Sequence, residues 1–82
     1  MEAFEAARNE ILEWVSEAIQ VPVNQIDLNK PLPELGLDSL DTVHLISTIE
    51  LVIHEELPEN VIQSVRCLGE ILEMMRKKLD GA

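Results

Sequence analysis

The sequence has few of the residues that build disulfide frameworks or aromatic cores. It contains one cysteine, one tryptophan, one phenylalanine and no tyrosine among 82 residues. The single cysteine, Cys67, excludes an intramolecular disulfide. The hydrophobic residues, 46% of the chain, must therefore form an aliphatic core of leucine, isoleucine and valine. Such a composition favours packed helices over an aromatic-rich sandwich or barrel.

Positive charge is also scarce. Six lysines and arginines stand against sixteen aspartates and glutamates, and the formal net charge is −10. A chain this acidic repels phosphate backbones and anionic lipid surfaces, so we expect neither nucleic acid nor a membrane as partner. Basic protein surfaces are the natural counterpart, although acidity also serves solubility alone. Because no apolar run is long enough for a membrane span or a signal peptide, we expect a cytoplasmic protein.

Hydrophobic periodicity predicts a small all-α fold in a single domain over residues 1–82. One amphipathic helix is expected over Ala3–Gln20, and a second from Asp38 or Ser39, both good N-caps, to about Glu56. A short helical turn is expected over Pro58–Gln63 and a last helix over Ser64–Leu79. The expected architecture is a small four-helix bundle of three main helices and one short helix.

The connection between the first two main helices is too apolar for a plain linker. Residues that need burial recur along it: Val23, Ile26, Leu28, Leu32, Leu35 and Leu37. We therefore predict a long ordered first loop over Val21–Asp38, with a helical turn near Asn24–Asp27; such loops are often functional. Gly69, inside the last helix, should cost about 1 kcal/mol relative to alanine, and nothing in the sequence accounts for it.

The stretch from Leu35 to Asp41, LGLDSLD, carries the chemistry. Gly36 permits a left-handed backbone, and Ser39 then begins a helix with its hydroxyl exposed. The free N–H groups and partial positive charge of a helix N-terminus favour an attached phosphate. Asp38 and Asp41 suit recognition by a basic modifying enzyme or coordination of that enzyme's metal. From the residues alone, Ser39 is more simply explained as a helix cap.

This stretch resembles the attachment signature of acyl carrier proteins, in which Asp-Ser-Leu opens the second helix. It looks most like the free-standing, type II carriers of bacteria. The resemblance covers nearly the whole chain, including the apolar positions of the family's first loop, second helix and last helix. The matching residues are Ile26, Leu28, Leu32, Leu35, Leu45, Ile46, Ile49, Ile53, Val65 and Leu68.

The resemblance implies a carrier and not an enzyme. A phosphopantetheinyl transferase would move a 4′-phosphopantetheine arm from coenzyme A to Ser39, with Asp38 and Leu40 beside it in the cofactor site. The arm would carry acyl groups as thioesters among acyl-loading and acyl-processing enzymes, in fatty-acid, specialised lipid or polyketide biosynthesis. We expect a monomer. An aminoacyl or peptidyl carrier and an unmodified acidic interaction module remain as alternatives.

The resemblance also implies two surfaces. One is an acyl pocket between the helices, whose size is left open by the short segment after Pro58. Each candidate residue of the pocket wall is also explained as ordinary core. These residues are Ile46, Ile49, Ile53, Val61, Ile62 and Leu68. Fatty-acid carriers dock partners through acidic residues on the outer face of the second helix. Here apolar residues and histidines partly replace them, which suggests a dedicated partner set. The candidate docking residues are Leu40, Asp41, His44, Ser47, Glu50 and Leu51.

Neither a metal site nor a catalytic residue is predicted. His44 and His54 lie ten positions apart on one expected helix, about 15 Å along its axis, and so cannot share an ion. Leu37 interrupts the Gly-Asp-Ser-Leu motif of some serine hydrolases. A small helical chain can moreover hardly supply both a general base and an oxyanion hole.

Overall fold

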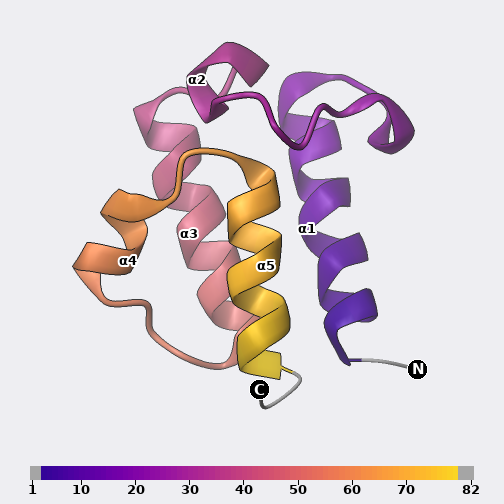
Figure 1. Ribbon diagram of the computed structural model, residues 1–82. Helices are drawn as coiled ribbons and strands as arrows, with labels where there is room; N and C mark the ends of the chain where they lie inside the picture. The colour runs from indigo at the N-terminus through magenta and orange to yellow at the C-terminus, as the bar shows by residue number, and fades with distance from the viewer. Residues whose placement is uncertain (1–2, 80–82) are drawn as a thin grey trace.

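The computed structural model describes residues 3–79, in which three long helices enclose the core (Figure 1). These are α1 (Ala3–Ile19), α3 (Ser39–Ile53) and α5 (Leu68–Leu79). Three short helices join them: η1 (Val23–Gln25), α2 (Leu32–Leu35) and α4 (Glu59–Ser64). Helix α1 packs on both α3 and α5, and α5 packs on α3. The predicted all-α fold is confirmed, and no helix among the described residues is long and apolar enough to span a membrane.

The core is aliphatic, as the composition predicted. Each long helix turns one apolar face inward, and each buried leucine or isoleucine contributes about 1.5–3 kcal/mol relative to an exposed position. Among residues 3–79 no polar or charged residue is buried. The buried residues of the three long helices are Ala7, Ile11, Leu12, Val15, Leu45, Ile46, Ile49, Ile53, Leu68, Ile71, Leu72 and Met75.

The first loop crosses one end of the bundle from α1 to α3 (Figure 1). Ile26, Leu32 and Leu37 are buried in it, which explains how a proline-rich connection can be ordered. Its helical turn lies at η1, close to the predicted position. The additional helix α2 was not predicted. It forms because Pro31 and Pro33 lie at its start, where a missing N–H costs nothing.

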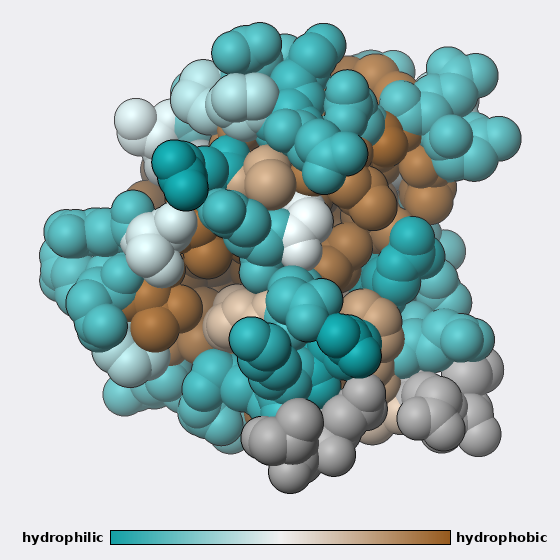
Figure 2. Space-filling view, in the orientation of Figure 1, coloured by the Kyte–Doolittle hydropathy of each residue, from teal (hydrophilic) through white to brown (hydrophobic). Residues whose placement is uncertain are grey.

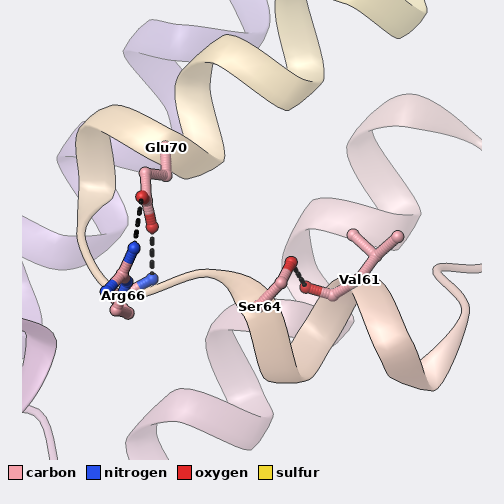
Figure 3. A network of polar contacts seen from close by, with 4 residues as sticks. All are labelled: Val61, Ser64, Arg66 and Glu70. Atoms are coloured by element: carbon pink, nitrogen blue, oxygen red, sulfur yellow. Dashed lines mark hydrogen bonds and ion pairs between the residues drawn. The ribbon is translucent and has the colours of Figure 1, made fainter.

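The last helix begins at Leu68, so the predicted start at Ser64 is wrong. Ser64 ends α4, and its hydroxyl donates to the Val61 carbonyl at 2.8 Å (Figure 3). Glu70, in the first turn of α5, binds the chain just before this helix. Its carboxylate accepts the backbone N–H of Arg66 at 2.7 Å and lies 3.8 Å from the Arg66 guanidinium (Figure 3). The chain between α4 and α5 is therefore free to pair with the first loop, where the Leu32 N–H donates to the Arg66 carbonyl.

Gly69 is explained by a close approach of the first loop. Its N–H donates to the Leu28 carbonyl at 2.8 Å. A Cβ at this position would lie 3.2 Å from the same oxygen, closer than ordinary van der Waals contact. The glycine therefore lets the first loop dock on α5, and a short backbone bridge between Pro31 and Cys67 continues that contact.

Candidate functional site

The start of α3 is closed by a capping box between Asp38 and Asp41. The Asp41 N–H donates to the Asp38 carboxylate at 2.8 Å, and the Asp38 N–H donates to the Asp41 carboxylate at 3.4 Å. Of the two caps that the sequence allowed, the structure therefore uses Asp38. Ser39 is exposed, and its hydroxyl has no hydrogen-bond partner within residues 3–79. The capping carboxylate thus leaves the serine oxygen available for reaction.

Gly36 and Leu37 set the direction in which the chain enters α3. Gly36 ends α2 with φ of 105°, a left-handed conformation that residues with a Cβ rarely adopt. Leu37, the next residue, is only 1% exposed, and its side chain anchors the chain in the core. Ser39 is the first residue of α3, and the start of this helix lies beside α2 (Figure 1).

The surroundings of Ser39 fit a phosphate-linked arm. The backbone N–H groups of Ser39 and Leu40 have no hydrogen-bond partner among the described residues, and they lie at the positive end of the α3 dipole. An open groove of about 440 Å³ runs beside the serine, lined by Pro33, Leu37, Asp38, Ser39 and Thr42. The first turn of α3 can therefore hold a phosphodiester on the serine oxygen, and the groove gives the arm a path along the surface.

Four of the six candidate docking residues form an exposed stripe on α3. Their spacing of three or four residues places them on one face of the helix. We call this set the outer stripe, and it consists of Leu40, His44, Ser47 and Leu51. Leu40 is 63% exposed and Leu51 is 76% exposed. No carboxylate lies on α3 between Asp41 and Glu50, so the stripe is neutral and partly apolar within an acidic molecule.

The other two candidate docking residues are half-buried, and their carboxylates bind backbone groups. Asp41 accepts the Asp38 N–H, as described above. Glu50 accepts the N–H of Leu57, in the connection between α3 and α4, at 2.7 Å. Both carboxylates therefore have structural partners beside the outer stripe.

The candidate pocket residues divide into two groups. Ile46 and Ile62 line a cleft of about 180 Å³ between α3 and α4, together with Thr42, Val43, Ser47 and Glu50. Hydrophobic residues reach the surface on the α4 side of the molecule (Figure 2). Ile49, Ile53 and Leu68 instead lie in the core, with exposed fractions of 0%, 7% and 0%. Val61 is half-buried and does not line this cleft.

Sequence reasoning missed Thr42 and Glu50 as cleft residues. A polar residue on a helix predicts a solvated position, and nothing near Glu50 in the sequence points to its contact with Leu57 seven residues later. His44 and His54 are both exposed. Within residues 3–79, no group of three or more potential ligands could hold a metal ion.

Comparisons with known proteins identify the family of this chain. A family described as "Phosphopantetheine attachment site" matches residues 9–75. An acyl carrier protein of Phytoplasma mali is 33% identical over 72 residues, which are 87% of this chain and 86% of the relative. Acyl carrier proteins of Amoebophilus asiaticus and Saccharopolyspora erythraea are 29% and 31% identical, over 84% and 82% of this chain and 88% and 76% of their own.

The chain therefore belongs to the phosphopantetheine attachment family, among the acyl carrier proteins. The resemblance read from the sequence is confirmed. The cofactor of this family is covalent 4′-phosphopantetheine, and its members are carriers rather than enzymes.

Proposed function

We propose that this protein carries acyl groups on a 4′-phosphopantetheine arm attached to Ser39. One observation carries the assignment: the Ser39 hydroxyl, at the start of α3, is exposed and has no hydrogen-bond partner among residues 3–79. Because Asp38 caps the start of α3, the Ser39 hydroxyl is not needed as the cap. The family match supports the same residue, since its span of 9–75 includes the Asp-Ser-Leu motif.

Attachment is a group transfer from coenzyme A. The Ser39 Oγ forms a bond to the phosphorus that carries the pantetheine, the bond to adenosine 3′,5′-bisphosphate breaks, and a base of the transferase takes the hydroxyl proton. The free N–H groups of Ser39 and Leu40 lie where they would stabilise the charge of the phosphodiester. The terminal thiol of the arm then holds the acyl cargo as a thioester.

We also propose that acyl-loading and acyl-processing enzymes dock on the outer stripe next to Ser39. Exposed apolar residues on one helix face are typical of a protein contact. The acidic charge of the whole chain would still attract basic partners over long range, while the stripe itself makes apolar contacts. The protein acts in this proposal as a cytoplasmic monomer with fatty acyl or polyketide cargo, and residues 1–82 form a single carrier domain.

Intact-mass measurement tests the attachment residue. Purified apoprotein is incubated with coenzyme A and a broad-specificity phosphopantetheinyl transferase. Wild type is expected to gain one phosphopantetheine group and Ser39→Ala none. The control is Ser64→Ala, which removes another exposed serine, on α4, and is expected to be modified like wild type. Circular dichroism checks that each variant is folded.

Two results would contradict the proposal. Modification of Ser39→Ala would mean that another residue carries the arm. Failure of folded wild type to be modified by several transferases would favour the unmodified interaction module instead.

A further inference from the structure

The cleft between α3 and α4 lies next to the groove beside Ser39. Thr42 lines both this cleft and the groove at the serine. Along α3, the cleft extends from Thr42 to Glu50, which is eight positions further and about 12 Å along the helix axis. A cargo chain entering from the Ser39 end therefore meets Thr42 first and Glu50 last.

Glu50 is held at that far end. Its Oε2 accepts the Leu57 N–H at 2.7 Å, and the Leu57 side chain is only 7% exposed. Hydrogen bonds to charged groups contribute about 1.5–3 kcal/mol, so the carboxylate does not leave this position freely. Leu57 immediately precedes Pro58, the N-cap of α4, and the same bond therefore also fixes where α4 begins.

An alkyl chain in the cleft gains from every methylene it buries until it reaches this carboxylate. The gain is about 0.8 kcal/mol per methylene. Stripping water from an ionised carboxylate costs several kcal/mol, which outweighs the burial of a few further methylenes. The volume of the cleft, about 180 Å³, is close to the roughly 150 Å³ that encloses a six-carbon ring in other proteins.

We propose that Glu50 is a specificity-determining residue that limits the buried part of the cargo to about six carbons. Shorter acyl chains fit within the cleft along their whole length. In longer chains the carbons beyond Glu50 remain in water. This inference rests on the proposed attachment at Ser39 and adds the class of cargo that the carrier protects, short-chain acyl groups.

The test uses carriers loaded at Ser39 with hexanoyl or decanoyl phosphopantetheine, transferred from the corresponding acyl-coenzyme A. Intact mass verifies the loading first, so a failure of attachment is seen separately from a failure of this inference. NMR then measures the shifts of the Ile46 and Ile62 methyl groups and the broadening of the terminal cargo methyl by a soluble paramagnetic agent. In wild type, both cargos are expected to shift the isoleucine methyls. Only the hexanoyl terminus is expected to be protected.

Variants at two glutamates distinguish the effect of a carboxylate in the cleft from the effect of the overall negative charge. Glu50→Ala is expected to protect the decanoyl terminus as well. Glu50→Gln retains an acceptor for the Leu57 N–H without the charge, and it is also expected to protect the decanoyl terminus. This second variant keeps the test valid should Glu50→Ala fold poorly. Glu56→Ala removes an equal charge from an exposed residue that does not line the cleft, and is expected to behave like wild type.

Either of two outcomes overturns the inference. One is a decanoyl terminus that is as well protected as the hexanoyl terminus in wild type. The other is a pair of folded Glu50 variants whose decanoyl terminus is as exposed as in Glu56→Ala.

Discussion

The two ends of α3 are built in different ways. At its start, the cap and its partner are three residues apart, and the left-handed residue is a glycine. At its far end, His54 adopts φ of 58° although it has a Cβ, and Glu50 binds Leu57 seven residues later. Lys78 of α5 also pairs with Glu55 there, across 23 positions of sequence. The start of α3, at Ser39, is thus specified by neighbours in the chain, whereas its far end, at Glu50, depends on contacts with α5 and with the chain that leads into α4.

The largest expected effect comes from removing the core anchor at the attachment end. Leu37→Ala is expected to lower the free energy of unfolding by about 2–5 kcal/mol, because Leu37 is 1% exposed and its loss leaves a cavity. Urea denaturation measures this. Leu40→Ala, three residues later and 63% exposed, should change stability by less than about 0.5 kcal/mol. Equal effects of the two substitutions would show that Leu37 does not anchor the start of α3.

An intermediate effect on stability is expected at Gly36 and His54, the two left-handed residues at the ends of α3. Gly36→Ala should cost about 1–2 kcal/mol, because alanine resists a left-handed backbone while its Cβ meets nothing closer than 3.9 Å. His54→Gly should be neutral or slightly stabilising, since glycine relieves the same strain at the far end but loses about 0.5–1 kcal/mol of backbone entropy. Thermal denaturation compares the pair. A destabilised His54→Gly would mean that the imidazole itself contributes to the helix end.

The smallest effect on stability is expected on the outer stripe. Leu51→Ser should leave the melting temperature nearly unchanged, because the side chain is 76% exposed. It should raise the transferase KM for the carrier by about five- to tenfold if Leu51 is buried on docking. Val23→Ser is the control, an exposed apolar residue on η1, away from α3. An unchanged KM for Leu51→Ser would place the transferase contact elsewhere.

Most of the fold was predictable because its signals are local. The apolar periods of the long helices, the prolines between them and the good N-caps at Asp38 and Ser39 predicted the all-α fold. The predicted boundaries failed where distant contacts decide them. Ser64 looks like a helix start, but it ends α4, and the chain after it pairs with the first loop, where the Leu32 N–H donates to the Arg66 carbonyl. Helix α2 was missed because two prolines in four residues resemble a loop.

The candidate site was predictable to a similar degree. Ser39 follows from the motif, and the outer stripe follows from helical spacing. The sequence pattern could not distinguish the residues that line the cleft from those in the core. Ile46 and Ile49 look alike in the sequence, yet the first lines the cleft and the second is fully buried. Only the position of α4 separates them.

The sequence by itself determined the family, the carrier role and the candidate serine, and it left two possible caps for α3, Asp38 and Ser39. A helix start depends on residues within one turn, so it can be read along the chain. The tertiary structure decided which hydrophobic residues border a cleft, why Gly69 is a glycine, and that Glu50 binds the Leu57 N–H. Those features depend on how separate segments approach one another, and that approach is set by packing of the whole core rather than by any local run of residues.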